Sequence, residues 1–123
     1  MIKATFLALL MSVSCSAFAQ WTEVGRDSAG DVTFVNFDSL KKEGSKRTYW
    51  TLTNFAGQPN PAASIRAKEL LDCKSETYQV ISMTGFSKHS AQGNVLGTIS
   101  MPEVTHIAPN TTAEIVMKAV CSK

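Results

Sequence analysis

The fold is decided by the last stretch of the chain, residues 108–121, which reads APNTTAEIVMKAVC. Thr111 and Glu114 have the spacing of a helix-capping box, and the proline and asparagine before them interrupt any preceding element. Beyond the cap, apolar side chains cover most of the helix circumference, and only Glu114 and Lys118 remain polar, as an i,i+4 pair. A helix this short is marginal alone in water. We therefore expect the rest of the chain to form the surface on which it packs.

The amino terminus predicts a secretory signal peptide over residues 1–19. Lys3 precedes a mainly apolar run over residues 4–13, and Ala17-Phe18-Ala19 forms an A-x-A cleavage site. Cleavage after Ala19 leaves residues 20–123 as a single domain without a transmembrane segment. The expected location is the periplasm or the cell surface.

Two alternatives to simple cleavage stay open. Cys15 follows Ser14, which suits a lipoprotein site, although Ser12 stands where a leucine is usual. Lipidation at Cys15 would anchor the chain to a membrane. The apolar run could also be an uncleaved anchor, but it is short for a bilayer.

Charge and cysteine content narrow the class of protein further. The full chain carries a net charge of +2, and removal of Lys3 with the signal brings the mature chain closer to zero. Nothing here predicts nucleic-acid or membrane-surface binding. The mature chain keeps Cys73 and Cys121, which in an exported small domain most simply form a disulfide. Two free buried thiols are the alternative.

Six stretches have the composition of β-strands. They are residues 21–25, 32–37, 46–55, 65–73, 78–86 and 95–101. The fourth has helix-forming residues, but its apolar positions alternate as in a strand. We expect a single helical turn capped by Asp38 or Ser39 after the second strand, and Pro102 to end the sixth. Strands at short spacing followed by one helix predict an α+β fold, an antiparallel sheet with a helix on one face.

The third strand has apolar side chains on both faces. Trp50 and Leu52 share one face, and Tyr49, Thr51 and Phe55 share the other. We expect Trp50 to face the helix. Tyr49 and Phe55 then lie on the outer face, where they could contact a partner or a second copy of the chain.

The sequence has no pattern typical of catalysis, metal binding or cofactor binding. His89 and His106 have no carboxylate or thiolate nearby in the sequence, and no serine lies in a G-x-S-x-G elbow. We therefore expect a protein that is not an enzyme and needs no cofactor. An enzyme whose groups converge only in space stays open as an alternative.

One charged feature stands out, the basic cluster of Lys41, Lys42, Lys46 and Arg47. It could attract an acidic partner such as a heparin-like polysaccharide. The simpler interpretation is a solvated hairpin end whose lysines discourage edge pairing. With Tyr49, Phe55 and His89, this cluster forms the candidate binding surface.

The order of several short motifs resembles the surface-adhesin protein E family of exported bacterial proteins. These are Trp21, Phe34-Val35-Asn36, Asp38-Ser39-Leu40, Trp50-Thr51-Leu52-Thr53-Asn54, Asp72-Cys73-Lys74, Tyr78, Ile107-Ala108-Pro109 and Val120-Cys121. Asn36, Val104 and Asn110 depart from the usual family residues. The resemblance implies a six-stranded antiparallel sheet whose C-terminal helix is tethered by a disulfide to the concave face. It also implies adhesion to host proteins.

These observations together predict an exported, non-catalytic binding protein, a surface adhesin that contacts a host surface or matrix protein. A homodimer is also expected as a candidate state. The alternative function is a periplasmic inhibitor or accessory subunit of an envelope enzyme, which would present an inserted loop around His89 to its partner.

Overall fold

A computed structural model of the chain describes residues 20–57 and 61–123. The predicted signal peptide and Cys15 lie outside these residues. The described part contains six strands and one helix: β1 (Thr22–Arg26), β2 (Val32–Glu43), β3 (Lys46–Asn54), β4 (Ser64–Asp72), β5 (Thr77–Lys88), β6 (Gln92–His106) and α1 (Thr112–Cys121).

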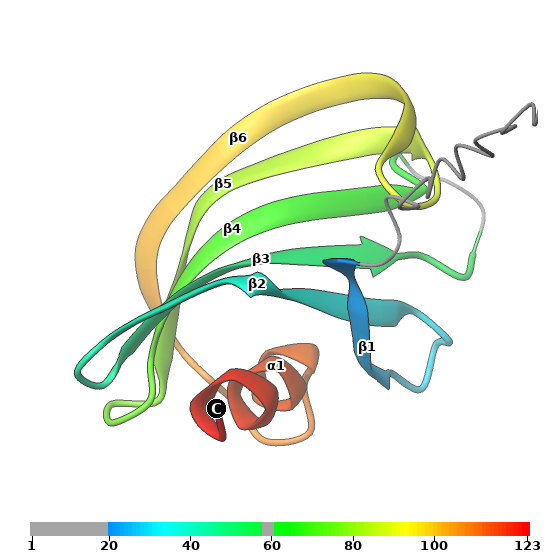
Figure 1. Cartoon of the computed structure of the whole chain (residues 1–123). Helices are drawn as coiled ribbons and strands as arrows, with labels where there is room; N and C mark the ends of the chain where they lie inside the picture. Colours follow the sequence, from blue (N-terminus) through cyan, green and yellow to red (C-terminus); the bar gives the residue numbers. More distant parts are fainter. Residues whose placement is uncertain (1–19, 58–60) are drawn as a thin grey trace, which may run out of the picture.

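The six strands form one open antiparallel sheet in sequence order, from β1 at one edge to β6 at the other. The sheet curves strongly, and α1 lies on the inner side of the curve (Figure 1). The helix contacts β1 and β2. We call the inner side the concave face and the outer side the convex face. The predicted α+β fold with a six-stranded sheet is confirmed.

Local sequence determines where α1 begins and how closely it approaches the sheet. The Thr111 hydroxyl accepts a hydrogen bond from the Glu114 backbone N–H at 3.3 Å, as the capping box predicts. Gly25 on β1 makes room for the helix, because a Cβ there would lie 2.7 Å from the Ile115 side chain. The predicted pair is also present, with Lys118 Nζ 3.4 Å from Glu114 Oε1.

The main core lies between α1 and the concave face. Val116 and Val120 of the helix pack with Val35, Tyr49 and Leu71 of three different strands. Tyr49 is 1% exposed. The prediction that Tyr49 lies on the outer face is therefore wrong.

Trp50, the next residue on β3, consequently lies on the convex face and not under the helix. Its ring lies 5.6 Å from the Arg66 guanidinium carbon. Both faces of β3 carry large apolar side chains, because Leu52 on the Trp50 side is also buried. Hydrophobic alternation alone therefore could not say which face the helix covers.

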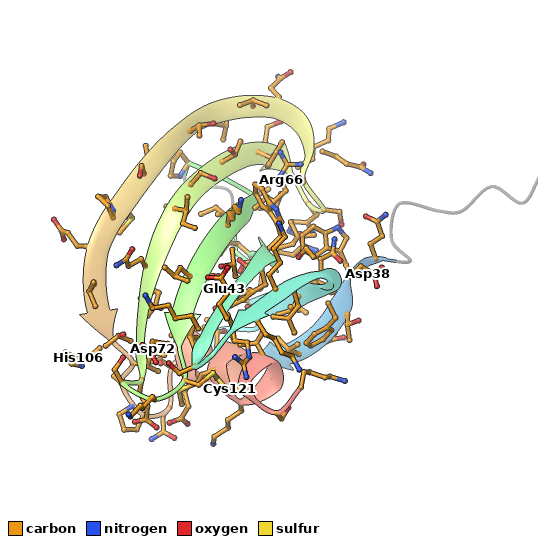
Figure 2. The ribbon with its side chains drawn as sticks, turned by 60° about the vertical axis from the view of Figure 1, so that its left-hand side comes forward. Asp38, Glu43, Arg66, Asp72, His106 and Cys121 are labelled. Carbon is orange, nitrogen blue, oxygen red and sulfur yellow. A yellow bond between two sulfur atoms is a disulfide. The ribbon has the colours of Figure 1, made fainter. Side chains whose placement is uncertain are left out.

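A disulfide joins Cys73, just after β4, to Cys121 at the end of α1. The cysteines are 48 residues apart in sequence, and their Cα atoms lie 5.9 Å apart. Asp72 and Cys121 mark this end of the sheet in Figure 2. The predicted disulfide is confirmed, and the alternative of two free thiols is wrong.

The strand β2 is longer than predicted and replaces the expected helical turn. Its pairing with β3 is interrupted by an irregularity between Asn36 and Lys41. There the Ser39 hydroxyl donates to Asn36 O at 2.6 Å and accepts from the Trp50 backbone N–H at 3.1 Å. The Ser39 side chain thus replaces a missing backbone partner, so the chain stays extended where a cap was expected.

The strand β6 also continues beyond its predicted end and passes through Pro102. Proline lacks an N–H donor, but β6 is an edge strand and its pairing with β5 shifts register between Tyr78 and Val80, opposite this proline. An edge or a bulge is where a strand tolerates proline. The predicted stop at Pro102 is wrong for this reason.

Candidate functional site

A cavity of about 290 Å³ opens on the concave face beside the first half of α1. We call it the concave-face cavity. Strands β2 to β5 form its floor, α1 covers one side, and the turn between β1 and β2 closes one end. Most of the surface that lines it is apolar, and it comes from side chains that include Phe55, Ile65, Ala67, Val80, Met83 and Val116.

The polar groups of the cavity are hydroxyls and carboxyls. Thr33, Thr51 and Thr53 contribute hydroxyls, and the carboxyls come from Glu69, Asp27 and Asp31. None of the described residues that line the cavity is lysine, arginine or histidine. The cavity is therefore apolar along its walls and acidic in its charged groups.

Glu69 is the carboxyl on the floor of this cavity. Burial raises the pKa of Glu69 to about 7, and a hydrogen bond with the Thr51 side chain acts in the opposite direction. Glu69 pairs with Tyr49 across β3 and β4. The carboxyl thus changes its charge close to neutral pH.

The hydroxyl of Tyr49 is buried beside this carboxyl without a hydrogen-bond partner. Burial, together with Glu69 and Tyr78, raises the pKa of Tyr49 far above its ordinary value, so the phenol stays neutral. An unpartnered buried hydroxyl costs free energy. The interior thus contains a hydroxyl without a hydrogen-bond partner, that of Tyr49, next to a carboxyl whose charged form is disfavoured by burial, that of Glu69.

Glu69 is not among the site residues predicted from the sequence, although the sequence contains a signal for it. Residues 65, 67, 71 and 73 are apolar and alternate along the fourth strand, and position 69 interrupts that series with a glutamate. A charged residue on the buried face of a strand needs a partner or a function. The glutamate at position 69, within a series of apolar residues, was therefore the signal for a functional residue.

The predicted basic cluster comes together at the tip of the hairpin formed by β2 and β3. Lys42 pairs with Arg47, and Lys41 and Lys46 lie one step to either side of that pair. The three lysines are exposed. Arg47 donates to the carbonyl oxygens of Gly44 and Lys46 at 2.8 and 3.0 Å, so its guanidinium is engaged in the turn.

The other predicted site residues lie elsewhere. Phe55 lines the concave-face cavity and not the outer face, which corrects its predicted position. His89 is exposed, and its Nε2 donates to Phe55 O at 2.7 Å, which anchors the β5–β6 turn on the end of β3. With Tyr49 in the core, the seven candidate residues do not form one surface.

The strand β6 has no paired neighbour on its outer side, and all 15 of its residues are exposed. Its large apolar residues are Val95, Leu96, Ile99, Met101 and Val104, each at least 48% exposed. Register pairs Ile99 with Met83 and Met101 with Val80, so these two continue the wall of the concave-face cavity. We call this strand and its free side the β6 edge.

No helix in the described part of the chain is long and apolar enough to cross a membrane. No group of three or more histidine, cysteine, aspartate or glutamate residues in residues 20–57 and 61–123 is placed to hold a metal ion.

Solved structures of protein E share this fold at 12–15% sequence identity. The structure of Haemophilus influenzae protein E superposes with a TM-score of 0.61 at 12% identity, covering 85% of each chain. Its crystal form II gives a TM-score of 0.59 at 15% identity, over 73% of this chain and 80% of that one. Protein E from non-typeable Haemophilus influenzae gives 0.59 at 12% identity, over 88% and 79%. A comparison with curated proteins gives no match.

The profile of one protein family, described as surface-adhesin protein E, matches residues 21–122. That range includes every strand, the helix and both cysteines of the disulfide. The match therefore extends over the whole described domain, in agreement with the shared fold. The chain belongs to the surface-adhesin protein E family.

Proposed function

We propose that the mature chain is an exported, non-catalytic adhesin that binds a protein of the host surface or matrix through the β6 edge. The family match supports the adhesin class. The β6 edge supports the contact surface, and it is the observation that carries the proposal.

The β6 edge has Pro102 and register shifts, which hinder pairing at an edge, but it lacks the other features that normally protect an edge strand. Natural edges are short, or carry lysines that discourage pairing with another chain. This strand has 15 residues, no lysine or arginine, and five exposed large apolar side chains. An extended segment of a partner could add to it as a seventh strand, with backbone hydrogen bonds for affinity and apolar contacts for specificity.

Lysine substitution on the edge tests this proposal. Ile99→Lys places a charge among the apolar side chains, and Thr22→Lys on the exposed opposite edge strand β1 is the matched control. Binding to a panel of purified extracellular-matrix proteins is measured by surface plasmon resonance. We expect at least one of them to bind the wild type, Ile99→Lys to weaken it at least tenfold, and Thr22→Lys to leave it unchanged. Equal binding by both variants, or no binding at all, would overturn the β6 edge as the contact.

A homodimer through the same edge is the second candidate. Two β6 strands can pair antiparallel about a two-fold axis. Electrostatic repulsion between the two strands would be small, because Glu103 is the sole carboxylate of β6 and the strand has no lysine or arginine. Sedimentation equilibrium measures the mass of the wild type, Ile99→Lys and Thr22→Lys. A dimer that only Ile99→Lys dissociates supports this state, and a monomeric wild type contradicts it.

The inhibitor or accessory-subunit function receives no comparable support. It requires a protruding loop around His89, but Lys88 pairs with Gln92 across a tight turn whose histidine is held against Phe55. The loop that would enter a partner is therefore short and anchored.

A further inference from the structure

We propose that the concave-face cavity binds a small organic amine, with its ammonium group against Glu69 and its apolar body against Val80 and Met83. This site borders the contact proposed for the β6 edge at Ile99 and Met101, but Glu69 lies outside that contact. The shape and the charge of the cavity support it in turn.

The size of the cavity suits a compact ligand. Its volume of about 290 Å³ lies near the lower end of the roughly 300–1,000 Å³ typical of ligand sites. The walls are mainly apolar, and Ile99 and Met101 extend them toward the β6 side through their pairing with Met83 and Val80. A single aromatic ring or a short alkyl chain matches this space.

The charge of the cavity selects a cation. Glu69, Asp27 and Asp31 line it, and no described lining residue is basic. The two aspartates already have partners, because Asp27 accepts from backbone N–H groups of its own turn and Asp31 accepts from the Ala56 N–H. Glu69 forms no ion pair among the described residues. The two aspartates form no ion pair among these residues either, so Glu69 differs from them in its burial, which raises its pKa.

An ammonium group supplies what the floor lacks. A partly buried carboxylate without a cation is unfavourable, and a charge-assisted hydrogen bond from an ammonium group offsets its desolvation. The aromatic rings of Phe55 and Tyr78 in the cavity wall also favour a cation nearby. An anionic ligand of the same shape would be repelled by three carboxyls.

Binding should depend on the charge of Glu69. The titratable groups that face it are Tyr49 from β3 and Tyr78 from β5, with Asp27 and Asp31 in the β1–β2 turn, and the lining residues from α1 carry no titratable group. The pKa of Glu69 is about 7. The ionised fraction therefore rises about tenfold between pH 6 and pH 8, and the affinity for an amine should rise by about the same factor.

The test uses 2-phenylethylamine as the probe and 2-phenylethanol as its uncharged match. NMR titration of the folded domain follows the methyl groups of Ala67, Val80, Met83 and Val116, all of which line the cavity. We expect the amine to shift these methyls and to bind at least tenfold more tightly than the alcohol at pH 8. Glu69→Gln should reduce amine binding at least tenfold at pH 8 and remove its pH dependence.

Glu76→Gln is the matched control, because Glu76 lies exposed in the β4–β5 turn away from the cavity. It should bind the amine as the wild type does. Equal affinity for amine and alcohol, or unchanged binding by Glu69→Gln, would overturn the proposal. Nα-acetyl-lysine-N-methylamide represents a lysine side chain of a partner protein. If it bound more tightly than 2-phenylethylamine, the proposal would also be overturned, in favour of such a side chain. Glu69→Gln leaves the β6 edge intact, so this result is independent of adhesin binding.

Discussion

Tyr49 contributes to stability through its ring and not through its hydroxyl. Its ring fills the core beneath α1, but its hydroxyl has no partner. We expect Tyr49→Phe to leave the free energy of unfolding unchanged or to raise it by up to about 1 kcal/mol. Tyr49→Ala should lower it by about 3–5 kcal/mol, as for other large-to-small changes in a core. Urea denaturation measures both.

Trp50→Ala is the comparison, because Trp50 lies on the opposite face and is only partly buried. Its loss of stability should be clearly smaller than that of Tyr49→Ala. The reverse order would mean that Trp50, and not Tyr49, supports the helix.

Glu69 should make stability depend on pH in an unusual direction for a carboxyl. The folded-state pKa is about 7, against an ordinary value of 4.5. Between these pH values the folded chain keeps a proton that the unfolded chain has lost, so stability falls as pH rises through this range, by up to about 3 kcal/mol. Thermal unfolding across this range measures the fall.

Glu69→Gln should remove this fall and be more stable than the wild type at pH 8, whereas Glu76→Gln should follow the wild type. Parallel curves for the wild type and Glu69→Gln would show that the carboxyl is well solvated in the folded chain.

At the scale of elements, α1 depends on its tether. A chain-entropy estimate for a disulfide across this separation is about 4 kcal/mol, and the helix is short. We expect Cys121→Ser to lower the free energy of unfolding by about 2–5 kcal/mol. Amide hydrogen exchange should accelerate first in α1 and only later in the sheet.

Cys73→Ser should lower the free energy of unfolding by the same amount. The double variant with both cysteines replaced should lower it little more, because all three variants remove the same bond. Unchanged exchange in α1 of Cys121→Ser would show that packing alone holds the helix.

Element boundaries were predictable where their signals are local. The start of α1 follows from Thr111 and Glu114, which interact directly. The full lengths of β2 and β6 were not predictable in the same way, because they depend on Ser39 reaching across to β3 and on Pro102 lying at an edge. Both depend on neighbours that a linear pattern does not specify.

At the scale of the whole molecule, the sheet order was predictable and the cavity was not. Short connections make sequential strands neighbours, and two cysteines allow one pairing. The concave-face cavity instead needs Asp27, Glu69 and Ala113 from three distant parts of the chain. The cavity also depends on which face of the sheet α1 covers. The sequence does not reveal that face, because β3 has apolar side chains on both of its faces.

Export gives a prediction for the whole chain. We expect the signal to be removed after Ala19, so that the mature protein begins at Gln20. Intact-mass measurement of the protein secreted by a bacterial host checks this. A mass that includes a diacylglycerol group on Cys15 would contradict it and indicate a lipoprotein.

The disulfide also determines how the molecule carries tension. Consider a pull applied at residue 20 and at Lys123, which lies two residues beyond Cys121. From Cys121 the force crosses directly to Cys73, so the intervening segment with β5, β6 and most of α1 carries no end-to-end load. While the bond holds, only the chain from residue 20 to Cys73 can be drawn out. An adhesin held at points outside the Cys73–Cys121 segment in flowing fluid would thus keep the part that contains its β6 edge from being extended.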